Sequence, residues 1–122
     1  MQIKSANFEL HPAGNFLGEI TNISQDISKY NGKQQLVFTI ATTPIDGERT
    51  ERTILQWTST SLSPRSKLGR LYMAVSGEEI HAGLEIDTDQ DLLHKNALVV
   101  VEHYQKEDGQ TGNRVSDWKQ LN

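Results

Sequence analysis

The feature that most constrains the fold is a pair of alternating segments in the first half of the chain. Apolar and polar residues alternate along Gln34–Thr43 and again along Glu51–Thr58, with turn residues at Pro44–Gly47 between them. A period of two is the repeat of a β-strand, so the segments are expected to be consecutive strands. In the first segment, one face holds Leu36, Phe38 and Ile40, and the other holds Gln35, Val37, Thr39 and Ala41. In the second segment, one face holds Thr53, Leu55 and Trp57, and the other holds Arg52, Ile54, Gln56 and Thr58.

Three further strands are expected around this pair. Phe16–Ile27 is β-rich, but its isoleucines break the period of two, which indicates a bulge or a bend that Gly18 permits. Ala97–Tyr104 is rich in β-branched residues and is typical of a buried strand. Arg114–Gln120 is expected to be the last strand.

One helix is expected between the third and fourth strands, because apolar residues there recur every three or four positions, which places them on one face of a helix. The stripe is followed by an acidic, irregular segment with an expected helical turn around Asp89–Leu93. The apolar stripe is Leu68, Leu71, Tyr72 and Val75. The expected N-cap is Ser63, with Pro64 in the first helical position, and the expected C-cap is Gly77.

The expected order is therefore β-β-β-α-β-β. Antiparallel strands in this order, with a helix over one open end, make the five-stranded OB-type Greek-key barrel. We expect an all-β fold with one helix in a single domain, residues 1–122. Residues 1–13 would be a lead-in with a short edge strand at Met1–Lys4, and residues 14–118 the barrel. An open α+β sheet is the alternative that this order also allows.

Composition narrows the class of protein. A chain of 122 residues with 35% hydrophobic content suits one thin domain. It has no cysteine, which excludes disulfides and cysteine-ligated metals. No segment approaches the roughly 20 apolar residues that span a bilayer, and the N-terminus lacks a signal-peptide pattern. The expected location is the cytoplasm, of a bacterium or of a phage-infected host, with no membrane partner.

The charge is distributed unevenly. The whole chain carries a formal net charge of -4, which argues against a strong nonspecific polyanion binder. Ile27–Gly77, however, holds seven basic and three acidic residues, whereas Glu78–Asp91 holds six acidic residues and no basic one. One reading is a basic face beside an acidic one; the other is two ordinary solvated surfaces.

The sequence offers no set of catalytic residues. It contains no G-x-S-x-G elbow and no phosphate-binding glycine loop, and its four histidines are not at metal-ligand spacing. We therefore expect no enzyme, no metal and no cofactor. The alternating carboxylates of Glu85–Asp91 are interpreted as a solvated surface, with a weak cation or protein-docking patch as the alternative.

Cations and aromatic residues near expected loops point instead to single-stranded nucleic acid. OB barrels bind such strands across their second and third strands, between the first hairpin loop and the last one. In the first loop, whose Asn31-Gly32 pair predicts a hairpin, two lysines flank a tyrosine that can stack on a base. The last loop, Lys106–Asn113, is polar and flexible. The loop candidates are Lys29, Tyr30, Lys33, Lys106 and Arg114.

Further candidates lie on the third strand and at the helix start. Thr58–Arg70 places hydroxyls and cations around a helix N-terminus, a setting that favours an anion such as phosphate, although ordinary helix caps share this composition. Trp57 shares a face with Leu55, so a core position and a stacking platform both remain open. Phe38 and Tyr72 are expected in the core. The candidates here are Arg52, Gln56, Trp57, Arg65 and Lys67.

Three segments give the chain a resemblance to a known group of proteins. They are G-E-I-T at Gly18–Thr21, W-T-S-T-S-L-S-P-R-S-K-L at Trp57–Leu68, and V-V-V-E-H at Val99–His103 with the following K-E-D-G loop. The chain resembles small OB-fold proteins of phages and mobile elements that are described as single-stranded-DNA-binding or replication-associated. The resemblance implies a non-catalytic accessory role in DNA replication or recombination.

The expected partner is single-stranded DNA, with RNA as an alternative. A homo-oligomer and replication proteins are further partners to test. Two other functions stay open: an OB module that docks a protein or mimics DNA through Glu78–Asp91, and a structural virion subunit.

Overall fold

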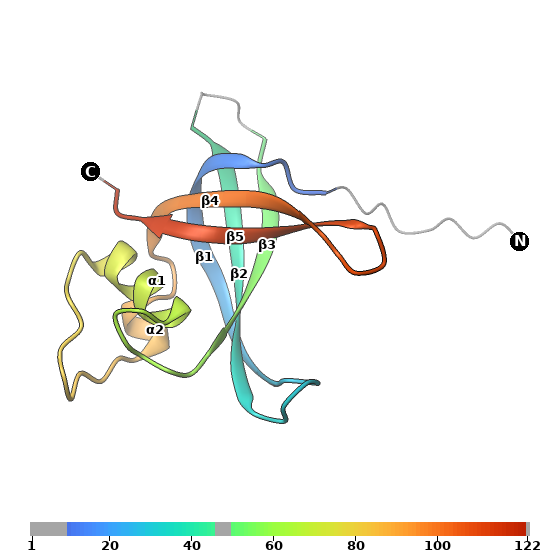
Figure 1. The fold of residues 1–122 in the computed structure, drawn as a ribbon. Helices are drawn as coiled ribbons and strands as arrows, with labels where there is room; N and C mark the ends of the chain where they lie inside the picture. The colour runs from blue at the N-terminus through green and yellow to red at the C-terminus, as the bar shows by residue number, and fades with distance from the viewer. Residues whose placement is uncertain (1–9, 46–49, 122) are drawn as a thin grey trace, which may run out of the picture.

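Five antiparallel strands form one open sheet in the computed structural model, which describes residues 10–45 and 50–121 (Figure 1). The strand order is β3-β2-β1-β4-β5, so β3 and β5 are the edge strands. The expectation of a β-rich fold is confirmed. The elements are β1 (Gly14–Ile27), β2 (Gln34–Pro44), β3 (Arg52–Ser59), α1 (Lys67–Ser76), α2 (Thr88–Asp91), β4 (Asn96–Gln105) and β5 (Thr111–Lys119).

The register between strands decides which residues form the core. Opposite residues of an antiparallel pair share a face, and the Leu36, Phe38 and Ile40 face of β2 is buried. These three residues lie opposite Thr58, Gln56 and Ile54, so that face of β3 also points inward. Apolar residues of β1, β4, β5 and α1 complete the core: Phe16, Ile20, Ala97, Val99, Val101, Val115, Trp118, Leu68, Leu71, Tyr72 and Ala74.

A bulge in β1 explains the broken period of its isoleucines. The register with β2 shifts between Ile20 and Asn22, which leaves Thr21 as the extra residue. Ile20 is buried, and Ile23, three positions later, packs against the core. Gly18, the expected bend, has another role: a Cβ there would lie 2.3 Å from Val99 Cγ2, so glycine lets β1 approach β4.

The helix stripe is confirmed, but the expected N-cap is wrong. The cap is Ser66, whose hydroxyl accepts a hydrogen bond from the Gly69 N–H at 2.9 Å. Ser63 and Pro64 lie in the preceding turn, where the Ser63 carbonyl accepts from the Ser66 N–H. A proline turn thus occupies the residues expected as the first helical turn. The expected C-cap is confirmed, since Gly77 is left-handed (φ 72°) and its N–H donates to Met73 O.

The remaining boundaries differ little from expectation. β5 begins at Thr111, opposite Gln105, which shortens the last loop to residues 106–110. The expected helical turn is present as α2. The expected edge strand at Met1–Lys4 and the second half of the Pro44–Gly47 turn lie outside the described residues. Among the residues described, no helix has the length and apolarity to cross a membrane.

Candidate functional site

The outer face of β3 carries exposed apolar side chains. Trp57 is 48% exposed and Leu55 is 42% exposed, while the inward face of the same strand holds the buried polar residues Gln56 and Thr58. Val37, opposite Trp57 on β2, is half-buried on the same outer face. Burying Leu and Trp in place of Gln and Thr would be the more favourable arrangement for folding alone. The outward apolar strip therefore needs another explanation, and exposed aromatic side chains are typical of binding surfaces.

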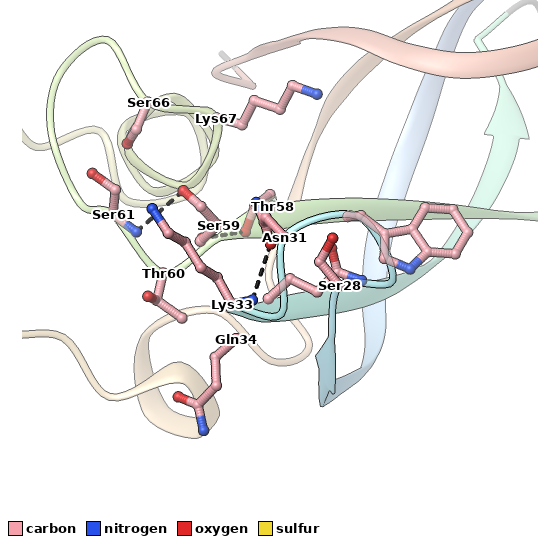
Figure 2. Close-up of a pocket in the computed structure, with 12 residues that line it drawn as sticks. Ser28, Asn31, Lys33, Gln34, Thr58, Ser59, Thr60, Ser61, Ser66 and Lys67 are labelled. Atoms are coloured by element: carbon pink, nitrogen blue, oxygen red, sulfur yellow. Dashed lines mark hydrogen bonds between the residues drawn. The ribbon is translucent and has the colours of Figure 1, made fainter.

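A hollow of about 1040 Å³ opens at the Ser59 end of this face. The β1–β2 loop forms one wall, and the segment from β3 to α1 forms the other (Figure 2). In Figure 2, Lys33 extends toward the segment that carries Ser59 and Ser61, and Lys67 extends from the first turn of α1. The lining residues are Ser28, Asn31, Lys33, Gln34, Gln35, Trp57, Thr58, Ser59, Thr60, Ser61, Ser66 and Lys67.

Local hydrogen bonds hold both walls of the hollow. In the β1–β2 loop, the Ser28 N–H donates to Lys33 O, and Asn31 Oδ1 accepts from the Lys33 N–H at 2.9 Å. In the other wall, the Ser61 N–H donates to Ser59 Oγ at 3.3 Å. Neither Lys33 nor Lys67 lies within 4.0 Å of a carboxylate of the described residues. Two lysine ammonium groups, several hydroxyls and an indole therefore face one open space, a combination that suits phosphates and bases.

Three of the candidate residues lie near this hollow without lining it. Lys29 and Tyr30 are exposed in the β1–β2 loop, and Arg65 is exposed in the turn before α1. The side chain of Tyr30 is 100% exposed, so its expected exposure is confirmed. These residues can reach a strand that leaves the hollow, but they do not shape it.

Gln56 is buried and serves the core. Its side chain is 7% exposed, and Gln56 Oε1 accepts a hydrogen bond from Trp118 Nε1 at 3.0 Å. The bond joins β3 to β5, the two edge strands of the sheet. Because this polar pair is buried and satisfied, Gln56 is not available to a ligand on the outer face.

Arg52 lies at the opposite end of β3 from the hollow. It lines a separate small cavity of about 190 Å³ with Leu10, His11 and Thr53. His11 is buried there, with Nε2 2.6 Å from Thr42 Oγ1 and Nδ1 2.8 Å from the Pro12 carbonyl oxygen. This end of the sheet anchors the segment before β1 and is separate from the candidate site.

The burial of His11 predicts a loss of stability in mild acid. Burial lowers the pKa of His11 below its ordinary value of 6.5, and electrostatic interactions with Arg52 and His103 lower it further, whereas the hydrogen bond to the Pro12 carbonyl raises it. The unfolded chain therefore binds this proton more readily than the folded one. The stability that neutral, buried His11 contributes is complete above pH 6.5. It is lost as the pH falls through 6.5 toward the lower pKa that His11 has in the folded protein.

Urea unfolding at pH 7.5 and pH 5.5 measures this effect. We expect the drop in the free energy of unfolding between the two pH values to be smaller in His11→Gln than in the unchanged protein. His81→Gln is the matched control, because His81 is exposed. An equal drop in His11→Gln and in the unchanged protein would contradict the assignment.

The last two candidates belong to the β4–β5 hairpin. Lys106 is exposed at the start of its turn. Arg114 is exposed on β5, with its guanidinium 5.3 Å from the centre of the Tyr104 ring and 3.9 Å from Glu102 Oε2. Neither lines the hollow at the Ser59 end of β3.

Several carboxylates of the acidic segment Glu78–Asp91 accept hydrogen bonds within the fold. Asp87 caps α2 by accepting from the Asp89 and Gln90 N–H groups, and Asp91 Oδ2 accepts from the Asp87 N–H. Glu78 Oε2 accepts from the Tyr72 hydroxyl at 3.3 Å. The apolar residues between these acids pack against the core: Ile80, Leu84 and Ile86. Acidic and apolar residues therefore alternate in this segment because its apolar side chains pack against the core and its acidic ones lie on the solvent side.

Comparison with known proteins leaves the site to be interpreted from its own chemistry. No model of a known protein family matches the chain, and no curated protein matches its sequence. Within residues 10–45 and 50–121, no group of three or more His, Asp or Glu side chains could hold a metal ion.

The sequence had indicated some of the site residues and missed others. The hollow contains Lys33, Trp57 and Lys67 of the expected set, and the hydroxyl-rich run after Trp57. Ser28, Gln34, Gln35 and the exposed Leu55 had not been singled out. Gln35 and Val37 alternate on the outer face of β2, which is the signal that could have found Gln35.

Proposed function

We propose that this protein binds single-stranded nucleic acid, preferably DNA, on the outer face of β2 and β3 and in the adjoining hollow, without catalysis. The observation that carries the proposal is the reversed polarity of the second half of β3, Leu55–Thr58. Its Trp57 and Leu55 face solvent beside the unpaired cations Lys33 and Lys67 of the described structure, while its Gln56 and Thr58 face the core. Bases stack on exposed aromatic rings, and lysines pair with phosphates.

We further propose that the sheet is an OB-type barrel. The order β3-β2-β1-β4-β5, with α1 between β3 and β4, supports this assignment. The buried hydrogen bond between Gln56 and Trp118 also supports it, because it brings the two edge strands together. In that fold the binding face lies on strands 2 and 3, which is where the exposed apolar strip is found.

The resemblance supports a biological setting for this binding. The middle segment of that resemblance, Trp57–Leu68, supplies five residues that follow Trp57, precede α1 and line the hollow: Thr58, Ser59, Thr60, Ser61 and Ser66. The proposal therefore places the protein in replication or recombination of a phage or mobile element, as a binder of exposed single strands.

Fluorescence anisotropy with labelled oligo-dT tests the proposal. The titration is run at low and at moderate salt, beside duplex DNA, while tryptophan emission is followed. We expect single-strand binding that weakens with salt, quenches tryptophan and exceeds duplex binding. The double variant Lys33→Glu/Lys67→Glu should lose this binding, whereas Lys95→Glu should keep it, because Lys95 is exposed and lies outside the hollow.

The decisive negative result is absence of oligo-dT binding at low salt. It would overturn the proposal and turn attention to a protein partner for the acidic segment. Equal loss of binding in Lys95→Glu would also count against the site, since it would show that overall charge matters and position does not.

A further inference from the structure

A second basic hollow adjoins the first one around α1. Its volume is about 550 Å³, and it lies over the outer side of β4 and β5 beside the first turn of α1. Lys67 lines both hollows, and Lys67 and Arg70 also line a narrow cleft beside the second hollow. The two hollows therefore meet at Lys67, and the narrow cleft lies where Gln56 of β3 contacts Trp118 of β5.

The charges of the second hollow favour a polyanion. It is lined by four basic residues, Lys67, Arg70, Arg114 and Lys119, and by two acidic ones, Glu102 and Asp117. Arg70 and Lys119 are exposed, and no carboxylate of the described residues lies within 4.0 Å of either. Ion pairing with Glu102 at 3.9 Å engages only Arg114, and both side chains of that pair are more than half exposed. Such an exposed pair is weak and would yield to a phosphate.

The floor of this hollow differs from that of the first. None of the described residues that line it is aromatic, and its uncharged residues are Val100, Val115 and Ser116. A ligand here would be held by its charge and its backbone, because the hollow offers no ring on which a base can stack. The first hollow, with Trp57, offers both kinds of contact.

We infer that a single strand bound on β3 continues past Lys67 into the second hollow, where Arg70 and Lys119 contact its phosphates. This inference rests on the proposed function and extends it, because it assigns a longer path and a second group of residues. The strand would be held by base stacking in the first hollow and by charge in the second. A long strand would then bind more tightly than a short one by the contribution of the second hollow.

The test compares the double variant Arg70→Ala/Lys119→Ala with the unchanged protein, on two oligo-dT lengths. The lengths are about 5 and about 15 nucleotides, which lie near the lower and upper ends of the range of site sizes for one OB fold. A longer strand offers more overlapping positions to any binder, but this factor is the same for both proteins and cancels in the comparison. Lys95→Ala removes one exposed positive charge outside both hollows and is the control for loss of surface charge.

The expected result is a loss confined to the long strand. The variant should bind the short oligomer as the unchanged protein does, and it should bind the long one roughly tenfold more weakly. Its salt dependence on the long strand should fall by about 1 to 1.5 in slope, since each lost phosphate contact removes about 0.7. Thermal unfolding should be unchanged, because both replaced side chains are exposed.

The outcomes separate the inference from the function on which it rests. An unchanged affinity of the variant for the long oligomer, with normal binding by the parent protein, would overturn the second path alone. Equal weakening on both lengths would also overturn it, because the residues would then act on the first hollow. Absence of binding to either oligomer by the parent protein would overturn the proposed function and the inference together.

Discussion

Replacing Trp57 by alanine is expected to weaken oligo-dT binding roughly 5- to 150-fold, because stacking of one base contributes about 1–3 kcal/mol. The side chain is 48% exposed on the outer face of β3, so little core packing is lost. The free energy of unfolding should therefore change by no more than about 1 kcal/mol. Anisotropy titration and urea unfolding of the same preparation measure the two effects.

Tryptophan emission gives a second readout of the same variant. The chain has two tryptophans, and Trp118 is 8% exposed with its indole N–H bonded to Gln56. In Trp57→Ala the remaining emission comes from Trp118 and should not respond to oligo-dT. In the unchanged protein, quenching by the oligomer should come from Trp57.

Trp57→Phe is the matched control for this prediction. A phenyl ring keeps an aromatic face at the same place on β3, so most of the affinity should remain. If Trp57→Ala bound oligo-dT as tightly as the unchanged protein, the outer face of β3 would not be the binding surface. If Trp57→Phe lost as much affinity as Trp57→Ala, stacking on an aromatic ring would not be the contact.

The second large effect is expected at Gly69, in the first turn of α1. A Cβ there would lie 1.7 Å from the carbonyl oxygen of Ser63 and 2.9 Å from Ile80 Cδ1. The first neighbour is backbone, which cannot rotate away as a long side chain can. Gly69→Ala should therefore lower the free energy of unfolding by at least about 2 kcal/mol, toward the upper end of overpacking effects.

The sign of this change decides the argument. In a helix without that contact, alanine would stabilise the chain by roughly 1 kcal/mol relative to glycine. Stabilisation of Gly69→Ala in urea unfolding would therefore contradict the close approach of Ser63. Gly109→Ala is the control for glycine substitution in general, since Gly109 has φ 85° and no atom of the described residues beyond its chain neighbours lies within 4 Å of the position of an added Cβ. It should cost only about 1–2 kcal/mol, for backbone strain.

Gly69→Ala should also change the shape of the binding site. The Ser63 carbonyl accepts from both the N–H and the hydroxyl of Ser66, and Ser66 lines the hollow. Displacing Ser63 would move the wall that holds Ser59–Ser61. In the fraction that stays folded, Gly69→Ala should bind oligo-dT more weakly than the unchanged protein, and Gly109→Ala should not.

Local patterns in the sequence determined the elements. The period of two in β2 and β3, the apolar stripe of α1 and the left-handed cap at Gly77 each depend on near neighbours in the chain, and all are present. The core positions of Phe38 and Tyr72 and the exposure of Tyr30 followed from the same patterns. Expected nucleic-acid binding stays a prediction, because it depends on a partner.

Long-range contacts decided the rest. The alternation of β3 defines two faces. Which face is buried depends on the register of β3 with β2, and on Trp118, 62 residues away, which donates a hydrogen bond to the buried side chain of Gln56. Periodicity records only which residues share a face. The free energy of burying that face depends on what packs against it, and so the exposure of Trp57 was set by tertiary structure alone.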